Sequence, residues 1–78
     1  EVQQGEFERR LARLSDRERQ ILDRVVAGQH NREIAAELSI SARTVEVYKA
    51  KVMDKLGAER LPELIRLVIE HEAGAPPR

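Results

Sequence analysis

The 78-residue sequence contains no cysteine and very few aromatic residues. Without cysteine the chain can form neither a disulfide framework nor a thiolate metal site, a composition that fits a reducing cytoplasm. Aromatic residues make up 3% of the chain and hydrophobic residues 41%, so we expect an aliphatic core. At this length the chain has room for one small domain.

Long apolar runs, a signal peptide and a charge imbalance are also missing. No run of 18 apolar residues occurs, so we expect no membrane span. Fourteen basic and fourteen acidic side chains cancel, which argues against nucleic-acid binding by bulk charge alone. The region 41–60 nevertheless has a local basic excess, with Arg43, Lys49, Lys51, Lys55 and Arg60 against Glu46, Asp54 and Glu59.

The side chains needed for catalysis or metal binding are absent as well. His30 and His71 have no cysteine or paired carboxylate at a metal-ligand spacing. The four glycines are isolated, so no glycine-rich phosphate loop is present. We therefore expect no enzymatic activity, no metal and no cofactor.

What the sequence does contain is a series of helix start and stop signals. Ser15 with Glu18 predicts a capping box at the start of one helix, and Gly28 predicts its left-handed end. Asn31 is the expected cap of a second helix, which ends near Leu38 or Ser39. This second helix begins a helix-turn-helix.

The next two helices follow the same logic. Ser41 caps the second helix of the helix-turn-helix, which runs to Leu56 before a stop at Gly57. A last helix begins near Leu61 and continues to about Glu72. No stretch alternates like a strand, so the predicted class is all-α, a small four-helix domain. We expect a linker with a frayed helix at 1–13, the domain at 14–72 and a flexible tail at 73–78.

The outer face of the helix at 41–56 is the candidate functional surface. Val45, Val52 and Leu56 point inward, whereas Val47 and Ala50 lie outside and can approach thymine methyls in a major groove. Around them lie potential phosphate donors, namely Thr44, Tyr48, Lys51 and Lys55. Glu46 can accept from a cytosine amino group or repel the DNA backbone. Periodicity alone fits an ordinary amphipathic helix of a small bundle equally well.

The last helix has more apolar residues than one stripe needs. Its core-covering stripe is Leu61, Leu64, Ile65, Val68 and Ile69, and Leu67 lies outside it. This surplus indicates either deep burial or a partner.

Several segments together resemble the LuxR/GerE-type helix-turn-helix domain, over about residues 12–72, and most closely the FixJ-like branch of NarL-type response regulators. The segments are LSDRERQIL (14–22), AG (27–28), NREIA (31–35), LSIS (38–41), TVEV (44–47) and KL (55–56).

The resemblance implies the C-terminal effector domain of a bacterial two-component response regulator, cytoplasmic and controlling transcription, with a receiver domain before Glu1. Its expected partners are double-stranded DNA, a second copy on DNA and RNA polymerase. The DNA-binding residues it implies are Asn31, Arg32, Thr44, Glu46, Val47, Tyr48, Ala50, Lys51 and Lys55. Arg43, which the helical period places on the same outer face, is also expected to bind DNA. The dimerisation residues are Leu61, Leu64, Leu67 and Val68.

Three residues depart from the family pattern. Tyr48 replaces a frequent His, Glu46 replaces a frequent Lys, and Arg60 replaces a Ser that often caps the last helix, whose start is therefore expected to be frayed. Two alternatives stay open: a sigma-factor-like promoter-reading module, and a helical protein-interaction module that uses Val47 and Ala50 on a partner helix.

Overall fold

Five helices and no strand make up residues 4–73, the part of the chain that the computed structural model describes. In chain order the helices are α1 (Gln4–Leu11), α2 (Asp16–Val26), α3 (Asn31–Leu38), α4 (Ala42–Leu56) and α5 (Leu61–Ala73). The predicted all-α class is confirmed, with one helix more than the four expected. The tail expected at 73–78 lies outside the described residues, apart from Ala73 at the end of α5.

The additional helix is α1, which lies in the segment expected to be a linker with a frayed helix. Phe7 is only 3% exposed and belongs to the same buried cluster as Leu56 and Leu64. Its ring centroid lies 5.1 Å from that of His71 on α5. An eight-residue helix has little stability by itself. α1 is therefore stabilised by apolar surface on α4 and α5, which periodicity in residues 1–13 does not reveal.

The predicted start and end of α2 are confirmed. The Ser15 hydroxyl accepts from the Glu18 backbone N–H at 3.1 Å, and the Glu18 carboxylate accepts from the Ser15 N–H at 2.9 Å. This capping box satisfies two backbone donors that a helix start leaves unpaired. Gly28 has φ +91°, a left-handed conformation that glycine adopts without steric cost.

The cap of α3 is His30, so the prediction of Asn31 was wrong by one residue. His30 has an extended backbone (φ −85°, ψ 161°), and its N–H donates to the Glu33 carboxylate at 2.8 Å. Asn31 is already inside the helix, and its side-chain oxygen accepts from Lys49 instead. Glu33 lies three residues after His30, the spacing of a capping box, so the position of this carboxylate indicates His30 and not Asn31 as the cap.

The α3–α4 turn and the end of α4 follow the predicted pattern. Ser39, with φ 59°, makes the left-handed turn between the two helices. Ser41 caps α4 by accepting from the Thr44 N–H at 3.0 Å, and Gly57 ends it with φ +76°. Both helices of the predicted helix-turn-helix are thus present, and α3 packs on α4.

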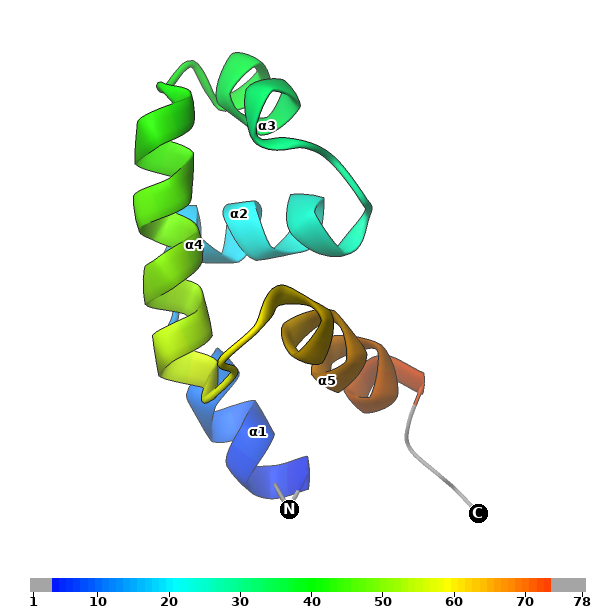
Figure 1. The fold of residues 1–78 in the computed structure, drawn as a ribbon. Coiled ribbons are helices and arrows are strands. Elements are labelled where there is room, and N and C mark those ends of the chain that lie inside the picture. Colours follow the sequence, from blue (N-terminus) through cyan, green and yellow to red (C-terminus); the bar gives the residue numbers. More distant parts are fainter. Residues whose placement is uncertain (1–3, 74–78) are drawn as a thin grey trace.

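α4 forms one edge of the molecule (Figure 1). α2 and α3 lie beside its first part, and α1 and α5 lie toward its C-terminal end. Val45 is buried with residues of α2 and α3, whereas Val52 and Leu56 are buried with residues of α1 and α5. The inner face of α4 is therefore fixed by both halves of the core, and its outer face is left uncovered by the described residues.

The start of α5 is held despite Arg60. The Glu63 carboxylate accepts from the Glu59 N–H at 3.0 Å, and the Leu64 N–H donates to the Arg60 carbonyl at 3.1 Å. These bonds take the place of the serine cap that is frequent in the family, and α5 begins at Leu61 without the fraying that Arg60 predicted.

Candidate nucleic-acid interface

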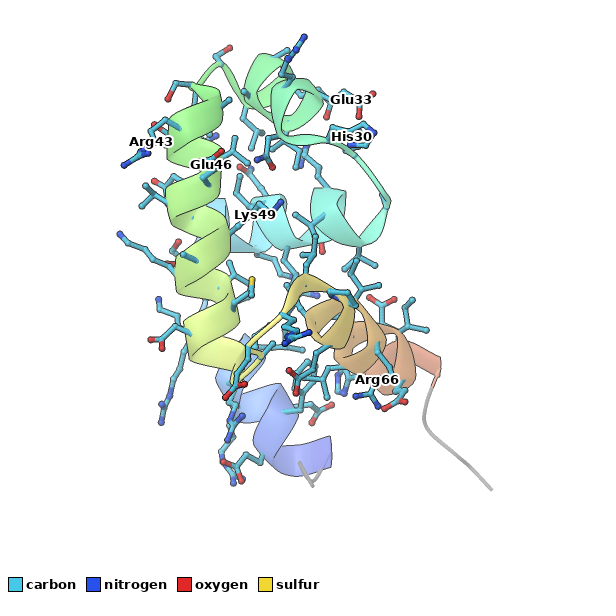
Figure 2. All side chains as sticks on the ribbon, in the orientation of Figure 1. His30, Glu33, Arg43, Glu46, Lys49 and Arg66 are labelled. Atoms are coloured by element: carbon cyan, nitrogen blue, oxygen red, sulfur yellow. The ribbon has the colours of Figure 1, made fainter. Side chains whose placement is uncertain are left out.

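The uncovered face of α4 is the surface on which a nucleic-acid contact can be built. Val45, Val52 and Leu56 are at most 1% exposed, as the helical period predicts. On the opposite side the side chains are exposed, and they are Arg43, Glu46, Val47, Ala50, Lys51 and Asp54. Figure 2 shows Arg43 extending from α4 away from α2 and α3. A helix with one buried and one open face can lie in a DNA major groove.

Val47 gives this face an apolar centre. Its side chain is 44% exposed, and it and Ile69 are the large hydrophobic residues exposed among residues 4–73. A single exposed valine is ordinary on a protein surface. Here it lies beside the small Ala50, so no long side chain keeps the helix axis away from base edges. The pair fits apolar contact with a thymine methyl.

A shallow hollow of about 420 Å³ runs along one side of this face. It is lined by Glu46, Lys49, Ala50, Met53, Asp54 and Ala58. Ala50 lies between two carboxylates one turn away on either side, at Glu46 and Asp54. The face therefore combines apolar contacts with acceptors that can bind base amino groups.

Three basic side chains are available for phosphates. Arg32, Arg43 and Lys51 form no ion pair with a carboxylate of residues 4–73. Lys51 Nζ lies 5.8 Å from the centroid of the Tyr48 ring, which favours one direction for the ammonium group. An unpaired, oriented cation at the border of a base-reading face can fix the register of DNA.

Thr44 and Ser41 form a hydroxyl pair at the start of α4. Their oxygens lie 2.9 Å apart, while Ser41 also accepts from the Thr44 backbone N–H. The cap thus holds the Thr44 hydroxyl near the positive end of the helix, where an anion is favoured.

Lys55 has a different environment from the other predicted phosphate ligands. Its Nζ donates to the Glu18 carboxylate at 2.7 Å and to the Arg13 carbonyl at 3.3 Å. Glu18 is only 5% exposed, and hydrogen bonds from Lys55 and then from the Ser15 N–H hold the pKa of its carboxyl below its ordinary value. Any phosphate would compete with this buried carboxylate, so the contacts assign Lys55 to joining α2 and α4.

Lys49 was not among the predicted site residues. Its Nζ donates to the Asn31 side-chain oxygen at 3.0 Å, and Figure 2 shows it on α4 near the start of α3. This bond connects the two helices of the helix-turn-helix beside the exposed Arg32. A contact between residues 18 positions apart leaves no periodic signal in the sequence.

The predicted dimerisation residues on α5 are distributed differently from the expectation. Leu64 and Val68 are 1% and 5% exposed, so they offer almost no surface to a partner. Leu67 is half-buried and packs against the core cluster of Phe7. The exposed apolar residue of α5 is Ile69, at 51%. A largely apolar surface hollow is instead lined by Leu61, Pro62, Ile65, Arg66, Ile69 and Glu70.

Comparison with protein families gives a match to the bacterial regulatory proteins of the luxR family over residues 12–68. The transcriptional regulatory protein FixJ of Azorhizobium caulinodans is 52% identical over 65 residues, which are 83% of this chain. FixJ of Rhizobium meliloti is 55% identical over 60 residues, which are 77% of this chain. The chain spans 31% and 29% of the lengths of these two relatives.

A solved structure gives the same result. Full-length FixJ from B. japonicum superposes with a TM-score of 0.82 and 43% sequence identity, covering 92% of this chain and 36% of that chain. None of the helices among residues 4–73 is long and apolar enough to cross a membrane.

Proposed function

Because the chain belongs to the luxR family of bacterial regulatory proteins, we propose that it is the DNA-binding domain of a transcription regulator. In this proposal α4 lies in the major groove, with Glu46, Val47 and Ala50 toward the bases. Arg32, Arg43, Thr44, Tyr48 and Lys51 lie toward phosphates, with Asn31 positioning Lys49 beside them. The observation that carries the proposal is the uncovered face of α4, where an exposed Val47 and a small Ala50 are bordered by cations that form no ion pair with a carboxylate of residues 4–73.

The proposal extends to the parts of the protein that this chain does not include. The relatives are about three times as long and are named as transcriptional regulatory proteins. We propose that a receiver domain precedes α1, that the regulator acts in the cytoplasm without catalytic activity, and that it contacts RNA polymerase. These partners follow from the family and not from any one side chain.

A second copy of the chain is the partner proposed for α5. The predicted set Leu61, Leu64, Leu67 and Val68 is revised, since the surface available on α5 is formed by Leu61, Ile65 and Ile69. Two copies related by a two-fold axis would place two α4 helices on half-sites about one helical turn apart. The small area of one helix favours pairing on DNA over a tight dimer in solution.

The test of the proposed function introduces a charge on the base-facing surface. A duplex is first selected from a random-sequence pool by the wild-type chain, and its affinity is measured for Ala50→Glu and for the control Gln20→Glu. Both residues are exposed and helical and both variants add one negative charge, but Gln20 lies on α2 and is not among the residues proposed to contact DNA. Ala50→Glu should lose specific binding at an unchanged melting temperature, because a longer anionic side chain separates the helix from the groove. Equal affinities for the two variants would refute the assignment.

A further inference from the structure

The N-terminal helix α1 lies outside the segment that matches the family, residues 12–68, yet it packs against the helix proposed to read DNA. Figure 1 shows α1 at the C-terminal end of α4. Phe7 is buried in the cluster that contains Val52 and Leu56 of α4. Phe7 and Arg10, which both precede the family segment, therefore contact α4 directly.

Arg10 is bound to the last carbonyl of α4. Its Nη1 donates to the Leu56 carbonyl oxygen at 3.2 Å, and its Nη2 pairs with Glu6 at 3.0 Å. The final carbonyls of a helix have no partner within the helix and carry partial negative charge. A guanidinium group at this end is thus a favourable cap, and Glu6 holds it in the required direction.

Gly57 provides the space for this cap. A Cβ built at Gly57 would collide with Arg10 Nη1, and the glycine also has φ +76°. The glycine at the left-handed end of α4 therefore allows the Arg10 guanidinium group to lie directly against the Gly57 backbone. Nearby, the Arg13 carbonyl, in the turn that follows α1, accepts from Lys55 and connects this turn to α4.

We propose that α1 is a positioning element for α4 and that Arg10 is its positioning residue, so that DNA affinity depends on whether α1 is docked. The inference rests on the proposed function. α1 has eight residues and cannot persist as a helix when undocked, so its release is a local unfolding step. Release removes the cap from Leu56 and the Phe7 side chain from the core cluster, which loosens the C-terminal end of α4. The sequence before α1 is joined to this step and can influence DNA binding through it.

The coupling between α1 docking and DNA binding can be tested in a way that separates it from a purely structural role of α1. If docking of α1 increases DNA affinity, then DNA must increase the docking of α1 by the same factor. Amide hydrogen exchange of residues 7–11 is measured in the full chain, free and with saturating duplex selected by the wild type. We expect DNA to slow exchange in α1 by about fivefold or more.

Arg10→Gln provides the matching affinity measurement, with Arg9→Gln as its control. Both variants replace one arginine of α1 by glutamine and lose the same charge, but Arg9 is exposed. Arg10→Gln should weaken DNA binding by about fivefold and speed α1 exchange, Arg10→Lys should restore part of both, and Arg9→Gln should change neither.

Two results would overturn the inference. One is a measurement in which DNA slows amide hydrogen exchange in α4 but not in α1. The other is equal DNA affinity for Arg10→Gln and Arg9→Gln although Arg10→Gln releases α1. Failure of the wild type to bind any duplex would overturn both the proposed function and this inference. The wild-type titration shows this by itself, so it distinguishes failure of the proposed function from failure of the inference alone.

Discussion

At the scale of single residues, the contacts separate basic side chains of two kinds. Lys51 lies over the Tyr48 ring and has no carboxylate partner among residues 4–73, whereas Lys55 is bound to the buried Glu18. A charge that is already paired inside the protein releases few counterions from DNA. The two lysines lie one turn apart on α4 and are therefore expected to contribute differently to binding.

The salt dependence of DNA affinity measures this difference. Lys51→Gln should reduce the magnitude of the log K against log salt slope by about 1 for each half-site contact removed. Lys55→Gln should leave the slope unchanged and lower the free energy of unfolding by about 1–3 kcal/mol, because it leaves Glu18 without its partner. Equal reductions of the slope by the two variants would show that Lys55 also contacts phosphate.

Glu18 gives a prediction for pH. The bonds from Lys55 and from the Ser15 N–H lower its folded pKa below the ordinary value of 4.5. A lowered folded pKa stabilises the protein above the unfolded pKa, and this stability is lost as pH falls through the folded pKa. The unfolding free energy of wild type should therefore exceed that of Glu18→Gln at pH 7, and the difference should shrink below about pH 4.5. Urea titrations of both proteins from pH 7 to pH 3 test this, and a difference that grows on acidification would contradict it.

At the scale of helices, local signals were sufficient for four of the elements. Capping by Ser15 and Ser41 and the glycine end at Gly57 depend on residues within one turn, so the sequence alone predicts them. α1 depends on Phe7 reaching Leu56 and Leu64, far along the chain. The Lys55 pairing with Glu18, 37 residues away, was missed for the same reason.

The sequence also did not correctly predict which side of α5 faces the core. The apolar stripe predicted that Ile69 covers the core and that Leu67 lies outside it. This prediction was wrong, because Leu67 packs against the core cluster that contains Phe7 and Ile69 faces outward. The surface offered to a second copy therefore moves to the side of α5 that carries Leu61, Ile65 and Ile69.

Two substitutions on α5 test this orientation. Ile69→Asp should keep the fold and the binding to an isolated half-site but remove cooperative binding to paired half-sites about one helical turn apart. Leu67→Asp should instead destabilise the monomer by about 1–3 kcal/mol, because it introduces a charge against the core. Gel shifts and sedimentation velocity provide the measurements. A stable dimer without DNA for both wild type and Ile69→Asp would place the interface elsewhere.

At the scale of the whole molecule, zero formal net charge does not prevent DNA binding, because charge is distributed unevenly. Several carboxylates are used within the protein: Glu18 binds Lys55, Glu37 binds Arg24 and Glu6 binds Arg10. Within the part of the chain that the structure describes, Arg32, Arg43 and Lys51 have no carboxylate partner. The helix start and stop signals and the absence of strand-like alternation predicted the class of fold, but only the pairing of charges identifies the face that is left for a polyanion.

Base preference is the most direct test of the claim that the outer face of α4 reads DNA. Duplexes are selected from a random pool by wild type, by Val47→Ala and by the control Val26→Ala, which shortens a half-buried valine on α2. Val47→Ala should change the preferred base at one or two positions of the half-site, where a thymine methyl loses its contact, while Val26→Ala should select the wild-type site. Identical base preferences for wild type and Val47→Ala would contradict it.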